Sequence, residues 1–186
     1  MEKEEWTVLV LGTGAVGKSS LSIRFVDQQF PEDYDPTIEE NYRILATVDD
    51  QECMLHVVDT AGVEELQSMS AFPTADGHLL VYSISDRASF EALPNIHLQI
   101  AVLPNVEARP TVVAANKTDL DPQHHVVSRA EGETFASEIN ASFFETSAKM
   151  HVNVDAAFHQ LVRSIRSSRS HPTLSDSSTK KACTLM

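Results

Sequence analysis

The stretch WTVLVLGTGAVGKSS, residues 6–20, decides how the rest of the chain is interpreted. Its apolar first half predicts a buried strand. Its second half, Gly12–Ser19, matches G-x-x-x-x-G-K-[ST], in which glycines let the backbone curl so that successive N–H groups point at phosphate oxygens. Lys18 adds a positive charge, the Ser19 hydroxyl can ligate Mg²⁺, and the following helix contributes its positive dipole end. The stretch therefore predicts a phosphate-binding loop, and the strand before it and the helix after it disfavour a chance glycine-rich turn.

Outside this loop, strand-like runs alternate with helical patterns. We expect strands within residues 6–12, 41–60 (two strands joined at an Asp49-Asp50 turn), 78–85, 110–116 and 141–147. We expect helices over residues 18–30, from a Ser128/Glu131 capping box to about Ile139, and from Asn153 onward. Pro94 predicts a kink or a late start for a helix within 85–103. The alternation predicts a mostly parallel sheet with helices on both faces.

Composition limits the classes of protein that the chain can be. The 186 residues suit one domain, and 42% hydrophobic with 22% charged residues is typical of a globular protein. The net charge of −13 argues against nucleic acid as a partner. Two cysteines, the absence of a run long enough to span a membrane, and an MEKEE start that is no signal peptide favour the cytosol.

Two further motifs follow expected strands. NKTD, residues 116–119, lies where doubly wound sheets bind ligands, and the Asp119 carboxylate can accept hydrogen bonds from guanine N1–H and the exocyclic amine. Adenine would place a lone pair against that carboxylate. ETSAK, residues 145–149, forms a turn whose backbone N–H groups can meet guanine O6. Either motif alone could be a plain loop; behind a phosphate loop they indicate a guanine nucleotide.

With these motifs in order over residues 6–167, the chain resembles a Ras-family small GTPase, and FPEDYDPTIEENY, residues 30–42, resembles the switch I and effector loop of the Ras branch. The resemblance implies a P-loop NTPase G domain at residues 1–167, with a six-stranded sheet whose one antiparallel edge strand lies near residues 40–48. Residues 168–186, serine-rich and without periodicity, are expected to be a disordered tail.

The resemblance also assigns residues to the nucleotide. The nucleotide-binding set is Gly12, Thr13, Gly14, Ala15, Val16, Gly17, Lys18, Ser19, Ser20, Phe30, Tyr34, Pro36, Thr37, Asp59, Thr60, Ala61, Gly62, Asn116, Lys117, Asp119, Leu120, Ser147, Ala148 and Lys149. Phe30 and Lys117 would contact the base, and Asn116 would tie the base loop to the phosphate loop. Mg²⁺ would be held by Ser19, Thr37 and, through water, Asp59.

The same resemblance implies a switch with protein partners. The γ-phosphate would give Thr37 and Gly62 a partner and order both switch loops, which relax after hydrolysis. Effectors would bind the residues Tyr34, Asp35, Pro36, Thr37, Ile38, Glu39, Glu40, Asn41 and Tyr42 and the adjacent edge strand. Exchange factors and GTPase-activating proteins are the other expected partners, and the protein itself is expected to be a monomer.

The sequence departs from the family at two places. Val63 replaces the Gln that usually orients the attacking water, so among the catalytic positions Lys18, Thr37, Gly62 and Val63 the last is degenerate. This predicts hydrolysis slower than the order of 10⁻⁴ s⁻¹ typical of the class, unless a partner supplies the missing amide. The span from Asp59 to Gly77 is two residues shorter than usual and contains Pro73. Recognition of this segment by family regulators is therefore in doubt.

The chain ends in CTLM, a C-a-a-X match that predicts farnesylation of Cys183. One prenyl chain anchors only marginally, and Lys180 and Lys181 are the only bases beside it. We therefore expect reversible residence on the cytosolic face of the plasma membrane or an endomembrane, with part of the protein in the cytosol. Three functions stay open: a slow GTP/GDP switch, a constitutively GTP-bound adaptor, and, much less favoured, a P-loop kinase.

Overall fold

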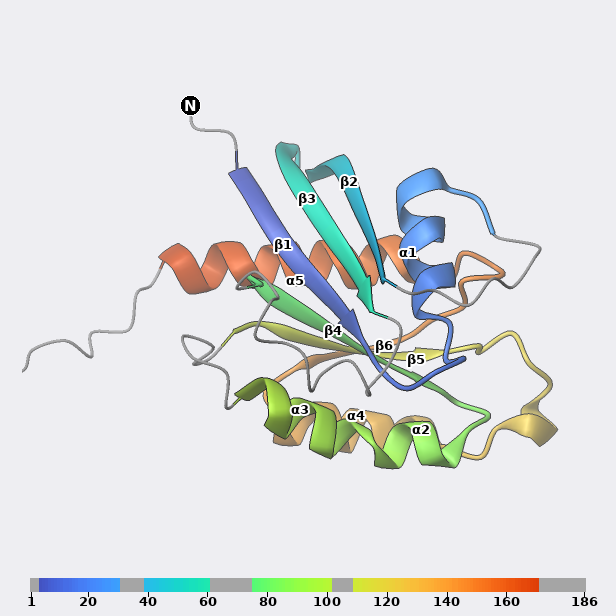
Figure 1. Ribbon diagram of the computed structural model, residues 1–186. Helices are drawn as coiled ribbons and strands as arrows, with labels where there is room; N and C mark the ends of the chain where they lie inside the picture. Colours follow the sequence, from blue (N-terminus) through green and yellow to red (C-terminus); the bar gives the residue numbers. More distant parts are fainter. Residues whose placement is uncertain (1–3, 31–38, 61–74, 102–108, 171–186) are drawn as a thin grey trace, which may run out of the picture.

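The computed structural model describes residues 4–30, 39–60, 75–101 and 109–170, and it shows a six-stranded sheet with helices on both faces (Figure 1). The strands are β1 (Glu4–Leu11), β2 (Glu39–Val48), β3 (Gln51–Thr60), β4 (Gly77–Ser83), β5 (Thr111–Asn116) and β6 (Ser142–Glu145). Their order is β2-β3-β1-β4-β5-β6, and every pairing is parallel except that of β2 with β3. The predicted sheet with one antiparallel edge strand is confirmed.

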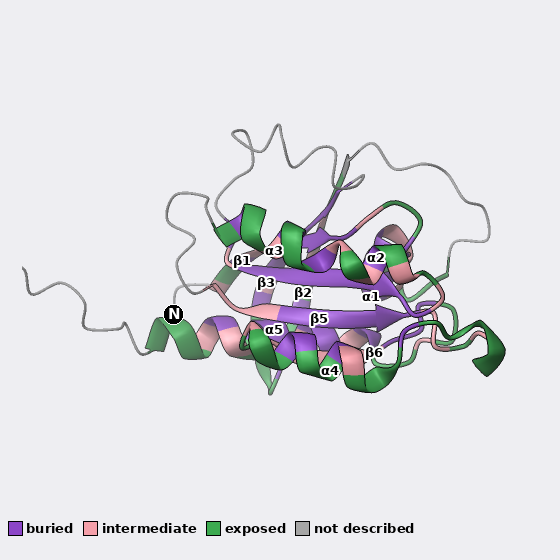
Figure 2. Ribbon diagram, turned by 90° about the horizontal axis from the view of Figure 1, so that it is seen from below, coloured by how far each residue is buried: buried purple, intermediate pink, exposed green. Residues whose placement is uncertain are grey.

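The helices divide between the two faces of the sheet (Figure 2). They are α1 (Lys18–Asp27), α2 (Arg87–Glu91), α3 (Leu93–Ala101), α4 (Arg129–Glu138), α5 (Val154–Ser170) and the 3₁₀ turn η2 (Pro122–His124). One hydrophobic core lies under α1 and α5 and includes Phe25, Phe158 and Leu161. The other lies under α2, α3 and α4 and includes Ile96 and Phe135.

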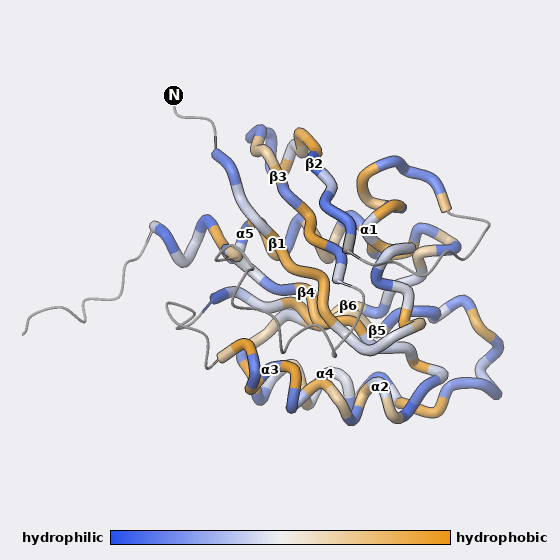
Figure 3. The backbone as a smooth tube through the Cα atoms, viewed as in Figure 1, coloured by the Kyte–Doolittle hydropathy of each residue, from blue (hydrophilic) through white to orange (hydrophobic). Residues whose placement is uncertain are grey.

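The central strands supply both cores at once. In β1, Val8 and Val10 belong to the core under α1 and α5, whereas Leu9 and Leu11 belong to the other. All four are nearly inaccessible, which explains why this run lacks polar alternation and reads as continuously apolar. Figure 3 shows hydrophobic segments of β1 and β4 in the middle of the sheet. β1 ends at Leu11, the last of these buried residues, and the phosphate loop begins directly after it.

Local signals account for the element boundaries. Asp49 and Asp50 have φ values of 54° and 61°, so the β2–β3 hairpin turns at the predicted pair. Ser128 and Glu131 form both bonds of the predicted capping box, and α4 begins at the next residue after Ser128. The helix α1 ends at Asp27, earlier than expected, because Gln28 adopts a left-handed φ of 59°.

Two segments refine the sequence-based expectation. The segment 85–103 contains the break that Pro94 predicts: two helices are separated at Ala92, and Pro94 lies in the first turn of the second, where its missing N–H leaves no hydrogen bond unmade. The last helix, α5, continues to Ser170 and so includes the first residues of the stretch expected to be a tail. Arg169 stabilises that last turn by an ion pair with Asp76, and its guanidinium lies 4.4 Å from the centroid of the Trp6 ring.

Candidate functional site

At two positions of the loop between β1 and α1, the surrounding atoms leave room only for glycine. Gly17 has φ 97°, and a Cβ there would lie 2.4 Å from Asn116 Nδ2. A Cβ on Gly12 would lie 2.2 Å from the carbonyl oxygen of Val81, which is backbone and cannot move aside. The loop is thus packed closely against Val81 of β4 and Asn116 of β5.

The start of α1 is prepared for an anion. Gly17 occupies the N-cap position, no side chain caps the helix, and its first turn contains no acid. The N–H groups that a cap would otherwise occupy therefore retain their donor capacity. Lys18 is only 5% exposed, and its ammonium group donates to the carbonyl oxygen of Thr13 at 2.9 Å, which holds the charge over the loop.

Asp59, at the end of β3, is a buried carboxylate beside this loop. It pairs in register with Val10 of β1, its side chain is inaccessible, and neither oxygen has a hydrogen-bond partner of good geometry among the described residues. Burial raises the pKa of Asp59 to about 6, although the nearby Ser19 hydroxyl and Lys18 ammonium favour the ionised form. Such a group is costly unless a cation or donor compensates it.

Ser19 and Asp59 suit a magnesium ion. Carboxylate and hydroxyl oxygens are suitable Mg²⁺ ligands, and Mg²⁺ is usually held by one or two protein groups together with water and substrate phosphates. Within the described ranges, no three His, Cys, Asp or Glu side chains gather into a metal cluster. Ser19 and Asp59 therefore fit an Mg²⁺ ion that also binds water and substrate phosphates.

Asn116 connects the ends of β5 and β1. Its Nδ2 donates to the carbonyl oxygen of Val16 at 2.9 Å, and its Oδ1 accepts from the Ala148 N–H at 3.3 Å. Lys117 has a positive φ of 71°, and its ammonium group donates to the carbonyl oxygen of Ala15 at 2.7 Å. Two side chains of NKTD thus hold the phosphate loop, including the tie that the sequence resemblance assigns to Asn116.

The other half of NKTD is held by the ETSAK turn. The Ser147 hydroxyl donates to Asp119 Oδ1 at 2.6 Å and accepts from the Met150 N–H at 3.0 Å. Ser147 is buried, whereas Asp119 is exposed. The Ser147 hydroxyl orients the Asp119 carboxylate. Because Asp119 is exposed, that carboxylate is accessible to a ligand with two adjacent donors, as guanine has.

Arg24 is a site residue that the sequence reasoning missed. It lies on α1, and its guanidinium donates to the carbonyl oxygens of Ala148 at 2.9 Å, Lys149 at 2.8 Å and Gln28 at 2.9 Å. It therefore fastens the ETSAK turn to the helix that follows the phosphate loop. The only sequence signal is a base in the last turn of that helix, which is too common to identify the contact.

The remaining predicted residues fall into two groups. Tyr34, Asp35, Pro36, Thr37, Ile38, Ala61, Gly62, Val63 and Cys183 lie outside the described residues. Of the others, Phe30 is 37% exposed, Leu120 donates its N–H to the Lys117 carbonyl oxygen, and the Thr60 hydroxyl donates to the Val10 carbonyl oxygen at 3.0 Å. Thr13 belongs to the phosphate loop, and Ser20 lies in the first turn of α1.

The predicted effector residues from Glu39 to Tyr42 form the first part of β2, at the edge of the sheet. The Tyr42 hydroxyl donates to Glu40, and burial raises the pKa of Tyr42. An edge strand can accept another strand through its backbone groups. Its position is therefore compatible with a protein partner.

Comparison with known proteins assigns the family. Residues 7–167 match the model of the Ras family. The chain belongs to the Ras family.

Three Ras-family relatives show how far the similarity extends. The Ras-like protein RAS2 of Hydra vulgaris is 43% identical over 164 residues, which cover 87% of this chain and 85% of the relative. A Ras-like protein of Laccaria bicolor is 44% identical over 164 residues, 87% of this chain and 78% of its own. The Ras-like protein rasS of Dictyostelium discoideum is 38% identical over 190 aligned positions, 96% and 97% of the two chains.

Ras-family proteins are small GTPases, so membership implies a GTP-binding switch. The resemblance seen in the sequence is thereby confirmed. In the described part of the chain, no helix is long and apolar enough to span a bilayer.

Proposed function

We propose that this protein is a Ras-type switch that binds GTP or GDP with Mg²⁺, hydrolyses GTP to GDP and phosphate slowly, and binds effectors in its GTP form. The observation that carries the proposal is the convergence of three sets of residues at the carboxyl ends of the strands. The uncapped α1 start with Lys18 suits phosphates, Asp59 with Ser19 suits Mg²⁺, and Asp119 held by Ser147 suits guanine.

Each set has a distinct task in this proposal. The loop N–H groups and Lys18 bind the phosphates and balance their charge. Mg²⁺, when bound, neutralises charge on the β- and γ-phosphates. Asn116 and Lys117 hold the base loop against the phosphate loop, so that base and phosphates are recognised by one rigid unit. Asp119 distinguishes guanine from adenine because adenine has an acceptor where guanine has a donor.

Val63 determines the proposed rate. Valine has no group that can orient a water molecule, so the attacking water would be positioned by the rest of the site alone. The hydrolysis rate should then lie below the order of 10⁻⁴ s⁻¹ typical of the Ras class. The second candidate, a constitutively GTP-bound adaptor, is favoured by the same residue and differs only in having no useful turnover.

Single-turnover hydrolysis of GTP separates these functions. Val63→Gln should raise the rate at least to the ordinary family level, whereas Glu64→Gln, which places the same amide one residue later, should leave it unchanged. GTP recovered from purified protein without measurable decay would support the adaptor. Hydrolysis by the unaltered protein at the ordinary family rate would refute the role assigned to Val63.

We also propose that Cys183 carries a single farnesyl group and that membrane binding is reversible. One chain gives marginal affinity, and Lys180 with Lys181 adds about 1 kcal/mol each at an anionic surface. Cys183→Ser should move the protein from the membrane to the soluble fraction of cells, and Ser177→Ala in the same segment should not. An unchanged membrane fraction for Cys183→Ser would contradict this proposal.

A further inference from the structure

A groove on the face opposite α1 and α5 has no part in the nucleotide site. It lies between α2 with the start of α3 on one side and α4 on the other, and it has a volume of about 520 Å³. Figure 2 looks onto this face of the sheet, with α2 and α3 along one side and α4 along the other. Its lining includes two aromatic rings, Phe90 and Phe135, and three carboxylates, Glu91, Glu131 and Glu138. A volume of this size lies in the range of pockets that bind ligands.

The floor of the groove is aromatic and well supported. The Phe90 ring lies edge-on to Phe135 with centroids 6.1 Å apart, and it lies 5.0 Å from the ring of Tyr82 in the core beneath. Both contacts are in the range of favourable aromatic pairs. The rings are therefore held in place, and the groove is a feature of the folded domain.

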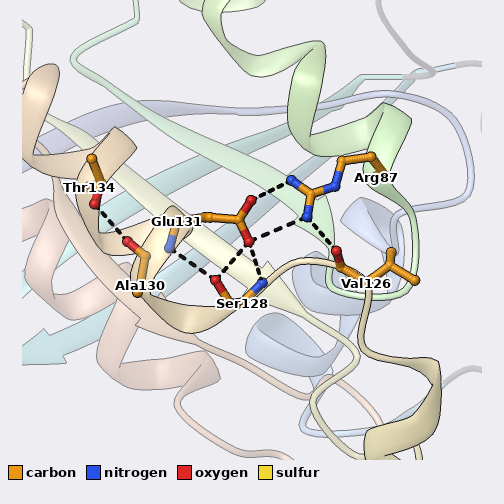
Figure 4. Close-up of polar contacts among 6 residues, drawn as sticks. All are labelled: Arg87, Val126, Ser128, Ala130, Glu131 and Thr134. Atoms are coloured by element: carbon orange, nitrogen blue, oxygen red, sulfur yellow. Dashed lines mark hydrogen bonds and ion pairs between the residues drawn. The ribbon is translucent and has the colours of Figure 1, made fainter.

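One end of the groove is fastened by a polar cluster (Figure 4). Arg87 of α2 pairs with Glu131 of α4 at 2.6 Å and also donates to the carbonyl oxygen of Val126. Glu131 in addition accepts from the N–H and hydroxyl of Ser128, and these bonds together hold the pKa of Glu131 at about 2. Its charge is thus balanced by Arg87 within the cluster, which makes this end of the groove a weaker site for a basic ligand.

The opposite rim is acidic and available. Glu91 and Glu138 are exposed, and neither forms an ion pair with any residue in the described ranges. The helices α2, α3 and α4 carry four glutamates (Glu91, Glu131, Glu133 and Glu138) against two arginines (Arg87 and Arg129). An apolar floor with an acidic rim suits a segment that combines lysines with apolar side chains.

The chain itself contains such a segment beyond α5. Residues 180–186, KKACTLM, combine two adjacent lysines with alanine, cysteine, leucine and methionine. Ser170, where α5 ends, lies at the amino-terminal end of the sheet, since its neighbour Arg169 pairs with Asp76 just before β4. The helix α4 ends at this same end of the sheet, where the parallel strands begin, because β6 follows it directly and Ser142 pairs with Val112 near the start of β5. Glu138 and the end of α5 therefore share one end of the molecule.

The connecting length is sufficient. Ten residues lead from Ser170 to Lys180, and an extended chain of that length spans up to about 35 Å. The path passes from the α5 face around the end of the sheet to the α4 face. Three layers, each about 10 Å thick, make that path roughly 30 Å long.

We propose that, as long as Cys183 is not lipidated, residues 180–186 dock in the groove between α2–α3 and α4 of the same molecule. Lys180 and Lys181 lie against Glu91 and Glu138, and the apolar residues lie over Phe90 and Phe135. This contact goes beyond the proposed function and requires neither nucleotide nor a lipid. It also removes the two lysines from any anionic surface, so docking and electrostatic membrane binding exclude each other.

Paramagnetic broadening in NMR spectra of the full-length, unlipidated protein tests the proposal. Cys53 is fully buried, so a nitroxide reagent should react at Cys183. The oxidised label should broaden the amide signals of Phe90, Ala130 and Thr134 more strongly than those of the β2–β3 hairpin. Salt near 1 M, which screens charges beyond about 3 Å, should reduce this preference.

Matched charge variants supply the control. Glu91→Gln/Glu138→Gln should reduce the preferential broadening by about two- to fivefold for each ion pair lost. Asp50→Asn/Glu52→Gln changes the net charge equally at the exposed hairpin and should leave the broadening unchanged. All four side chains are exposed, so the fold should persist in both variants, and an unchanged spectrum elsewhere verifies this.

Three results would overturn the proposal. The first is broadening no stronger in the groove than near the hairpin. The second is equal broadening in both double variants. The third concerns a mixture of isotope-labelled protein without a spin label and spin-labelled protein without isotope label. Broadening of the groove signals in that mixture would show that the tail of a second molecule binds the groove.

Discussion

Replacing Asp59 with asparagine should stabilise the empty protein while weakening its binding of Mg²⁺ and nucleotide. The pKa of Asp59 is raised from 3.8 to about 6, chiefly because the carboxyl is buried. A carboxyl whose pKa is higher in the folded state opposes folding once it is ionised. The penalty is absent below pH 3.8, grows between pH 3.8 and about 6, and is complete at pH 7.

The size of the effect follows from the shift. About two pKa units at 1.36 kcal/mol each give a penalty of about 3 kcal/mol at pH 7. Asparagine is nearly isosteric and uncharged, but its amide needs hydrogen bonds that the carboxylate did not. We therefore expect Asp59→Asn to gain about 1–3 kcal/mol in the free energy of unfolding without nucleotide and Mg²⁺.

Urea unfolding at pH 7 measures this gain directly. It should be performed on protein freed of nucleotide in the presence of a chelator, and then with Mg²⁺ and GDP. The order of stability should reverse, because a ligand adds more to the free energy of unfolding of the protein that binds it more tightly, here the unaltered one. Asp50→Asn, at an exposed turn, is the control and should change neither state. An Asp59→Asn protein that is less stable than the original when empty would refute the reasoning.

Three further predictions concern the pH response, the base and the fold. Burial lowers the pKa of His78 to about 4, so the neutral form is favoured by folding, and the free energy of unfolding falls as the pH drops from 6.5 towards 4. Urea unfolding at pH 7 and pH 5 should therefore show a loss about 2 kcal/mol smaller for His78→Leu than for the original protein. An equal loss in both proteins would contradict this. Asp119→Asn should weaken GDP binding and favour a xanthine nucleotide, whose C2 carbonyl can accept from the amide; unchanged guanine preference in a competition assay would contradict it. Ser128→Ala removes a helix cap and should cost about 1 kcal/mol in thermal or urea unfolding, whereas no change would show that the capping box is not needed.

Sequence patterns were most informative where one residue type is required for a physical reason. Gly12 and Gly17 lie where any Cβ would collide with Val81 or Asn116, so the glycine pattern identified the loop. The Asp49-Asp50 turn was readable because both residues adopt positive φ, which Asp and Asn tolerate. The sheet order and the antiparallel edge came from the family resemblance, because periodicity does not state which strands are neighbours.

Long-range contacts of ordinary residues could not be predicted. Arg24 reaches a turn more than a hundred residues away, and nothing in its neighbourhood distinguishes it from a surface base. The break at Ala92 was placed only approximately, because proline is tolerated in the first turn of a helix as well as at a kink. The acidic groove arises from residues on separate helices, so it too required the structure.

The central claim is that the loop, Asp59 and the Asp119–Ser147 pair form a guanine-nucleotide site. Competition for the purified protein between a fluorescent GDP analogue and unlabelled nucleotides, with and without Mg²⁺, tests this most directly. GDP and GTP should displace the probe with similar affinity, Mg²⁺ should strengthen binding, and ATP should not compete at a large excess. Displacement by ATP as readily as by GTP would contradict the account.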